Sequence, residues 1–239
     1  LLLDVVERAE GSRSAAAARA LAQLGAQDEA WAVLEARLAD PNAEVRLGAI
    51  AAAVALGEPR SIPRLIALAR DKSTPRPVRS LAARALGVAA RGKVGPATRS
   101  LGALFGDGDA TVREAAALAI LRAGQDGARD RGLFFQLDPL LRDRDPRVRV
   151  AAIQAAAKVA GVWAAPDIVS AAHRERDVRA LASIALALTH VPGPEALRTL
   201  NQLARHDDDR VRKNALATLA HKPGAAARFS AFLADPDVE

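Results

Sequence analysis

The residue that recurs most regularly and could do chemistry in this sequence is an arginine preceded by valine. The pair occurs six times and supplies Arg46, Arg79, Arg113, Arg149, Arg179 and Arg212. An aspartate stands five or six residues before four of these arginines, at Asp40, Asp107, Asp143 and Asp207. A guanidinium beside a carboxylate forms charge-assisted hydrogen bonds. Such pairs either hold a fold together or bind an anionic ligand.

Residues for catalysis are scarce. The four histidines, His173, His190, His206 and His221, form no His-Glu dipeptide and no HExxH motif. The sequence has no GxSxG, P-loop or GxGxxG motif. The absence of cysteine excludes disulfides, thiolate zinc sites, iron–sulfur clusters and a cysteine nucleophile. We therefore expect no enzyme activity, no metal and no cofactor.

The charge is basic but mixed in sign. The 239 residues include 34 Lys and Arg against 28 Asp and Glu, for a net charge of +6. The sequence pI of about 10.6 reflects the many arginines and the absence of Tyr and Cys as titrating acids. Nucleic-acid binding through phosphate contacts therefore stays open as an alternative. No apolar run approaches the length of a membrane-spanning helix.

The elements that carry the arginines are predicted to be helices in a repeat. Half of the residues are hydrophobic and 3% are aromatic, which favours an all-α fold. The Val-Arg pairs are spaced by 33, 34, 36, 30 and 33 residues. After each valine a small or aliphatic stripe follows on one helical face, with residues such as Leu86, Ile120 and Leu186 at the eighth position. An acidic turn precedes each pair, and a less regular helix precedes the turn.

Each unit is thus a helix, an acidic turn and a second helix. One such pair cannot bury its apolar face alone, so stacking of neighbouring units is expected. We predict one continuous array over residues 1–239, and we expect it to be part of a longer protein. The expected units are 1–25, 28–57, 60–91, 94–124, 128–161, 164–190 and 193–221, with a partial unit at 223–239.

The frame D-P-x-x-x-V-R-x-x-A, followed by this stripe, resembles HEAT repeats, in particular the short kind found in phycobilisome lyases. The resemblance implies a right-handed α-solenoid of about seven helix pairs. It also implies an Asp–Arg ladder between turns and a concave side lined by the second helices. The sequence departs from the frame at Arg13-Ser14 and at Val238-Glu239. HEAT-like hydroxylases bind iron through His-Glu pairs, which this sequence lacks.

The structural ladder leaves the second helices as the candidate binding surface. Positions two, six and ten after each valine lie away from the buried stripe. The polar residues there that could bind a ligand are Arg84, Arg122, Lys158, Lys213, Gln154 and His221. An ordinary solvated face is the alternative. The aromatic residues, among them Trp31, Phe134, Phe135 and Trp163, are expected to fill the core or the space between repeats, as are Phe105, Phe229 and Phe232.

The leading hypothesis for function is a non-catalytic scaffold that presents an extended surface to a protein partner, such as an acidic segment. Phosphate-backbone binding in a basic groove is the first alternative, and a bilin-lyase-like or chaperone-like accessory role is the second. We also expect the apolar flank at an end of the array to favour end-to-end association. The compartment stays open, with the cytoplasm favoured. The sequence identifies neither the partner nor the oligomeric state.

Overall fold

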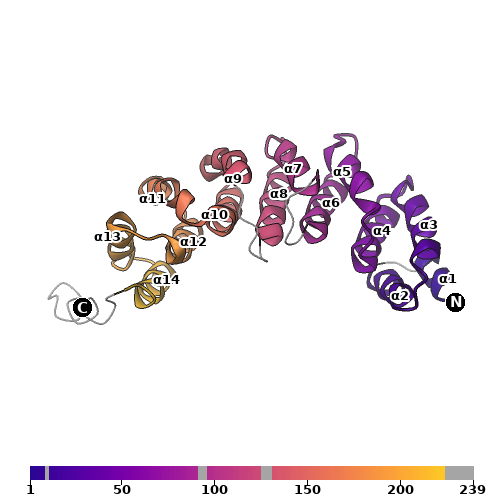
Figure 1. Cartoon of the computed structure of the whole chain (residues 1–239). Coiled ribbons are helices and arrows are strands. Elements are labelled where there is room, and N and C mark those ends of the chain that lie inside the picture. The colour runs from indigo at the N-terminus through magenta and orange to yellow at the C-terminus, as the bar shows by residue number, and fades with distance from the viewer. Residues whose placement is uncertain (9–10, 91–95, 125–130, 224–239) are drawn as a thin grey trace.

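The computed structural model describes residues 1–8, 11–90, 96–124 and 131–223. Within these ranges the chain is helical and has no strand. The helices come in consecutive pairs, and from α1 to α14 the pairs stack into an arch (Figure 1). The predicted fold class, an all-α solenoid of about seven helix pairs, is confirmed. The partial unit at 223–239 lies outside the described residues except for Pro223.

The second helix of each pair lines the inner side of the arch, and the first helices from α3 onward lie outside them (Figure 1). The first helices are α1 (Leu2–Arg8), α3 (Gln27–Leu38), α5 (Ser61–Arg70), α7 (Pro96–Leu101), α9 (Arg131–Leu137), α11 (Ala165–Arg174) and α13 (Pro194–Leu203). The second helices are α2 (Gly11–Gln23), α4 (Ala43–Leu56), α6 (Arg76–Ala89), α8 (Ala110–Ala123), α10 (Pro146–Ala160), α12 (Val178–Ala187) and α14 (Asp209–Ala220). Short 3-10 turns extend several of them: η1 (Gly102–Leu104), η3 (Asp138–Arg142), η4 (Gly161–Ala164) and η5 (Leu188–His190).

The acidic turns set where the inner helices begin. Asp109 is the N-cap of α8, and its Oδ1 accepts a hydrogen bond from Thr111 N at 2.8 Å. Asp145, Asp177 and Asp208 cap α10, α12 and α14 in the same way. Such a cap satisfies a backbone N–H that has no partner inside the helix, and it is worth about 1 kcal/mol. The turn therefore fixes the register of the helix that follows it.

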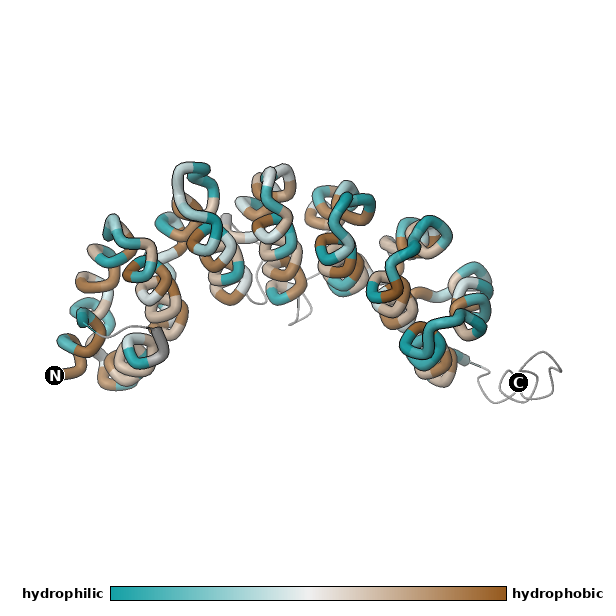
Figure 2. Tube along the Cα trace, turned by 180° about the vertical axis from the view of Figure 1, so that it is seen from behind, coloured by the Kyte–Doolittle hydropathy of each residue, from teal (hydrophilic) through white to brown (hydrophobic). Residues whose placement is uncertain are grey.

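Alanine lets the inner helices approach closely. Ala115, Ala116 and Ala119 of α8 are fully buried, as are Ala152 and Ala155 of α10. At the α6–α8 contact, a Cβ added to Gly87 would lie 2.5 Å from Ala119 Cα, so only glycine fits there. The buried residues form one core cluster from Val6 to Leu219. Hydrophobic residues recur in every pair along the array, whereas the turns are mostly hydrophilic (Figure 2).

The helix α12 does not follow the predicted register. In α8 the paired arginine, Arg113, is the fourth residue after the N-cap, and the same holds in α4, α6, α10 and α14. In α12 the N-cap is Asp177, so Arg179 is the second residue and Leu181 is the fourth. The expected burial of Leu186 is wrong, because its side chain is 49% exposed.

The buried residues of α12 include Ala180, Leu181, Ile184, Ala185 and Ala187, and Leu188 of η5 is buried as well. Ile184 and Leu188 are fully buried, although the predicted register places them on the open face. The sequence pattern predicts the wrong register because α12 has a second set of apolar residues with the same helical spacing, shifted by two positions toward the C-terminus. The position of the cap decides between the two registers.

One continuous helical stretch, Pro146–Arg174, is long and apolar enough to cross a membrane by composition alone. It is not a single straight helix, because Gly161 has a φ of 55° at the end of α10 and η4 intervenes before α11. Of the 18-residue window with the highest mean hydropathy in this stretch, 61% is buried inside the structure. This stretch is therefore accounted for as core-forming helices of the solenoid.

Candidate binding surface

Three arginines of the acidic turns each hold a carboxylate of the next repeat. Arg113 Nε donates to Asp143 Oδ2 at 2.7 Å, and its Nη2 donates to Asp143 Oδ1 at 2.8 Å. Arg149 holds Glu175 in the same two-bonded way, at 2.7 and 2.8 Å. Arg79 Nη2 reaches Asp107 Oδ1 at 3.1 Å. We call these three pairs the central ladder; they join four consecutive helix pairs.

The same arginines also bind the turn that precedes their own helix. Arg113 Nη1 donates to the carbonyls of Asp107 and Gly108, and Arg149 Nη1 donates to those of Asp143 and Arg144. Each guanidinium thus ties its own turn to the next one. Arg113 and Asp143 are only 6% and 8% exposed, so neither is available to a ligand. The central ladder is therefore part of the fold and not a binding site.

The ladder stops on both sides of this central part. Arg46 donates to the carbonyls of Asp40 and Pro41, but its buried Nε has no partner. In the next turn, the carboxylate of Asp71 accepts hydrogen bonds from Ser73 and Thr74 of its own loop. The Asp40 carboxylate likewise caps its own turn by accepting from Asn42 N. Between the second and third pairs, no ion pair joins Arg46 to Asp71 within the described residues.

At the other side, the predicted ladder role of Arg179 is wrong. Its side chain is 61% exposed and pairs with Asp177 of its own turn. This follows from the register of α12, which places Leu181 where the ladder needs an arginine. Arg212 keeps the contact to its own turn, through the carbonyls of His206 and Asp207. Its ion pair is with Asp209, at 3.4 Å, and not with Asp207.

Ionisation of the ladder acids is coupled to these contacts. Burial raises the pKa of the Asp143 carboxyl, but hydrogen bonds from Arg113 and from Asp145 N outweigh burial, so the pKa lies below its ordinary value. The pKa of Glu175 is lowered by the same balance, with Arg149 as the main partner. The pKa of the capping Asp145 falls to about 2, chiefly through its hydrogen bond from Arg147. All three acids are therefore charged at neutral pH.

The inner side of the arch presents a different set of charges. Arg84 of α6, Arg122 of α8 and Lys158 of α10 are exposed on three successive inner helices. Within the described part of the chain, none of the three makes an ion pair or a side-chain hydrogen bond. We call them the inner-face cations. They differ in this respect from the ladder arginines, whose charges are neutralised by the fold.

The other predicted binding residues are less open to a ligand. Lys213 Nζ pairs with Asp209 Oδ2 at 2.6 Å within α14. His221 Nδ1 lies 2.7 Å from the carbonyl of Ala217, one turn back. Gln154 of α10 is half-buried between the exposed residues of the same face. The structure thus places Arg84, Arg122, Lys158 and Gln154 on adjacent helices, with Lys213 and His221 farther along the array.

One exposed residue of this face was missed by the sequence analysis. Leu186 of α12 occupies the position that Gln154 has in α10, counted from the N-caps Asp177 and Asp145. Its exposure adds an apolar element beside the inner-face cations. The sequence feature that could have predicted this exposure is Asp177, because the N-cap aspartate fixes where the helix begins and therefore which later residues face the solvent.

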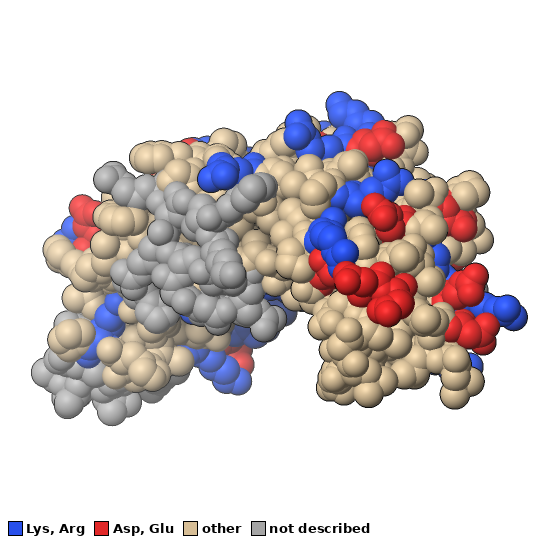
Figure 3. All heavy atoms as spheres, turned by 45° about the vertical axis from the view of Figure 1, so that its right-hand side comes forward, with Lys and Arg blue, Asp and Glu red and all other residues tan. Residues whose placement is uncertain are grey.

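Within the described residues, no group of three or more His, Asp and Glu side chains is arranged so that it could hold a metal ion. On the face drawn in Figure 3, Lys and Arg lie beside Asp and Glu in a mixed band. This mixture matches the ion pairs of the turns. On this face, the positive charges of Lys and Arg therefore lie next to negative charges that offset them.

The aromatic residues only partly follow the expectation of core filling. Trp31 and Phe134 are buried, and Arg60 lies over the Trp31 ring at 5.8 Å from its centroid. Phe135 and Trp163 are exposed, which corrects the prediction for these two. Neighbouring residues of a helix point about 100° apart, so Phe134 and Phe135 cannot both face the core. Phe229 and Phe232 lie outside the described residues.

Comparison with known proteins agrees with this architecture. Residues 2–87 match the family model described as HEAT repeats. An engineered protein solved by the Northeast Structural Genomics Consortium superposes with a TM-score of 0.57 at 21% identity, over 92% of this chain and 67% of that one. The complex of CpcE and CpcF of phycocyanin lyase from Nostoc sp. PCC7120 gives a TM-score of 0.56 at 23% identity, over 79% of this chain and 75% of that one.

A search of the curated proteins finds no matching relative. At these identities the two structures show the fold alone. The stacked helix pairs, the turn arginines and the family match lead to the same conclusion. The chain is an all-α solenoid of stacked helix pairs, and residues 2–87 of it match the family model described as HEAT repeats.

Proposed function

We propose that this solenoid is a non-catalytic scaffold whose inner face, from α6 to α10, binds an extended acidic segment of a partner protein. One observation carries the proposal. The inner-face cations Arg84, Arg122 and Lys158 are exposed and unpaired, whereas the ladder arginines are paired. An unpaired cation costs the fold nothing to neutralise, so an acidic ligand need not break an existing contact to bind it.

The spacing of the helices suits an extended chain. Packed helices lie about 8–10 Å apart, and an extended peptide advances about 3.3 Å per residue. An acidic residue at every third position would therefore meet one cation per helix pair. The half-buried Leu118 and the exposed Leu186 offer apolar contact beside the cations. The proposed ligand is thus acidic with intervening apolar residues.

The test uses a fluorescein-labelled peptide of repeated Glu-Gly-Ser units, whose binding is followed by fluorescence anisotropy at low salt. The variant R84E/R122E/K158E should weaken binding at least about tenfold, since three attractions become repulsions. The matched control is R64E/R70E/R99E, which reverses three exposed and unpaired cations on the outer helices α5 and α7. Equal loss in both variants, or no binding by the unaltered protein, contradicts the acidic-segment proposal.

Phosphate-backbone binding is separated by a second titration, with a labelled random DNA duplex at about 50 and about 200 mM salt. Six or more phosphate contacts would weaken the affinity by roughly a thousandfold over that range. Duplex binding tighter than peptide binding, lost in the inner-face variant, would assign the face to nucleic acid instead. Stacking on single-stranded bases has no support, because the helices α4 to α14 that line the inner side carry no aromatic residue.

A bilin-lyase-like role is not favoured by a specific residue. The similarity to the CpcE and CpcF complex concerns the fold alone. We therefore keep the scaffold as the proposed function.

A further inference from the structure

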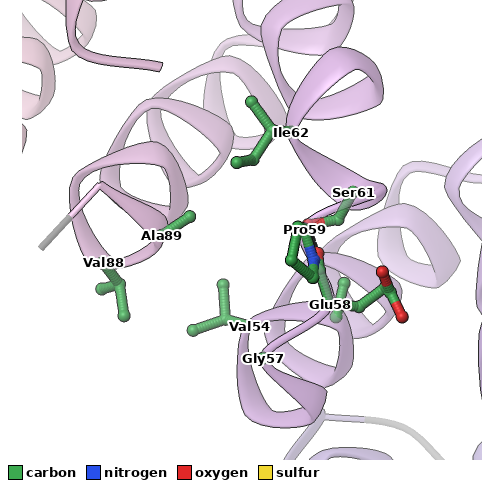
Figure 4. Close-up of a pocket in the computed structure, with 9 residues that line it drawn as sticks. Val54, Gly57, Glu58, Pro59, Ser61, Ile62, Val88 and Ala89 are labelled. Atoms are coloured by element: carbon green, nitrogen blue, oxygen red, sulfur yellow. Dashed lines mark hydrogen bonds between the residues drawn. The ribbon is translucent and has the colours of Figure 1, made fainter. Parts of the chain in front are cut away.

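A pocket lies between the second and third helix pairs. Its volume is about 220 Å³, and it lies between the end of α4, the start of α5 and the end of α6. Val54, Ile62, Val88 and Ala89 surround the same space from these three helices (Figure 4). An apolar cavity of about 150 Å³ already accepts benzene. The space is therefore large enough for one aliphatic or aromatic side chain.

The packing between these two pairs explains why the pocket forms there. Gly87 lets α6 contact α8 at backbone distance, while on its other side Val88 faces Val54 of α4 across the pocket. The same interface lacks a ladder rung, because Arg46 has no carboxylate from the next turn. Gly57, with a φ of 71°, ends α4 and turns the chain toward α5. The two pairs thus lack the ion pair that joins each of the next three interfaces of the array.

The polar groups at the pocket are already committed. Glu58 pairs with Arg60 at 2.7 Å, and Arg60 also pairs with Asp28 at 2.7 Å. Ser61 Oγ donates to the carbonyl of Glu58 at 2.6 Å. The other side chains that line the pocket are aliphatic, so it offers an aliphatic side chain burial from water. It therefore selects an aliphatic group over a polar one.

The position of Arg84 connects the pocket to the cations. Arg84 precedes Val88 by four residues on α6, so the two side chains lie on one face, one turn apart. Arg122 and Lys158 follow on the next two inner helices, on the side away from the pocket. Along the array, the apolar pocket therefore comes first and the three cations follow it on α6, α8 and α10.

We propose that this pocket anchors an aliphatic side chain at one end of the acidic segment that the inner face binds. The inference rests on the proposed function and adds the order of aliphatic and acidic residues in the ligand. The ligand has an aliphatic residue first and acidic residues at about every third position after it, extending from α4 toward α10.

The experiment compares two fluorescein-labelled peptides of equal length and charge. Both carry repeated Glu-Gly-Ser units, and they differ only in a terminal residue, which is leucine in one and serine in the other. The leucine peptide should bind the unaltered protein about tenfold more tightly, as burial of one aliphatic side chain predicts. The variant V88F, which fills the pocket, should lose this difference and keep its affinity for the serine peptide.

Two further variants serve as controls. One fills the pocket from a second position, and the other enlarges an apolar residue outside the pocket. A89L fills the same pocket from an exposed position and should act like V88F. V162F enlarges an exposed apolar residue of η4 that lies outside both the pocket and the set of inner-face cations, and it should keep the full preference for leucine. Circular dichroism melting confirms that each variant is folded.

The outcomes separate the two proposals. Equal affinity for both peptides, with binding still lost in R84E/R122E/K158E, overturns the pocket and leaves the acidic-segment function intact. No binding of either peptide overturns the acidic-segment function and the pocket with it. A leucine preference that persists in both V88F and A89L places the anchor elsewhere and also overturns the inference.

Discussion

Arg113 of one repeat holds Asp143 of the next through two short hydrogen bonds, from Nε and Nη2 to the two carboxylate oxygens. Its Nη1 meanwhile binds the carbonyls of Asp107 and Gly108 in its own turn. Removing the arginine would leave a buried carboxylate and two carbonyls without their donor. This one side chain therefore joins local turn geometry to the register between repeats.

The substitution R113A should lower the free energy of unfolding by about 2–4 kcal/mol, because loss of one partner strands a buried charge. Chemical denaturation measures the change. R179A is the matched control: it also removes a turn arginine, but one that is exposed and pairs only within its own turn, so stability should stay nearly unchanged. Peptide affinity should be equal in both folded variants. Equal destabilisation by R179A would contradict the register of α12.

The stability of the array should fall in acid. The pKa values of Asp143 and Glu175 in the folded chain lie below their ordinary values of 3.8 and 4.5. The unfolded chain therefore binds protons at higher pH than the folded chain. The stabilisation by these acids is complete above the ordinary values and is lost as pH falls through the folded values. We expect a level melting temperature from about pH 7 to about pH 5 and a decline below about pH 4.5.

The variant D143N tests this assignment. At neutral pH it should be less stable than the unaltered protein, because the charged partner of Arg113 is gone. The stability gap between the two proteins should narrow as pH falls from the ordinary value of 3.8 through the lower pKa of Asp143 in the folded chain, because the carboxyl then becomes protonated in both folded and unfolded chains. A gap that stays constant with pH would show that the Asp143 charge is not the source of the acid dependence.

The close contact of α6 and α8 depends on Gly87. The substitution G87A should destabilise the protein by about 1–3 kcal/mol through overpacking against Ala119, even though alanine favours helix. G106A is the control, since a Cβ at Gly106 meets no atom within 4 Å. Thermal melting of both variants decides the matter. If G87A were as stable as G106A, the close contact between α6 and α8 would not contribute to the free energy of unfolding, and the prediction would be contradicted.

The register of α12 is checked by two leucines of the same segment. Leu188 is fully buried, and L188A should cost about 2–5 kcal/mol. Leu186 is exposed, and L186A should leave the free energy of unfolding nearly unchanged. The register predicted from Val178-Arg179 requires the opposite order. Denaturant titration of the two variants therefore distinguishes the registers directly.

The sequence by itself determined the repeating architecture. Periodic Val-Arg pairs, alanine stripes and acidic turns specify helix starts and apolar faces locally, and each rule concerns residues within one unit. Asp109 and Asp145 illustrate this, because capping needs only the two or three residues that follow. The placement of Arg84, Arg122 and Lys158 on exposed positions of successive inner helices was predictable for the same reason.

Only the tertiary structure decided which charges meet. Arg149 pairs with Glu175, a residue outside the predicted ladder, because the carboxylate that counts is the one brought near by stacking. Among the described residues Arg46 makes no ion pair, and Asp71 of the next turn accepts hydrogen bonds from Ser73 and Thr74 of its own loop. In α12 an alanine-rich helix satisfies the apolar pattern in two registers, and the cap at Asp177 selects one. Local patterns leave such choices open, since their energies depend on contacts between units about 30 residues apart.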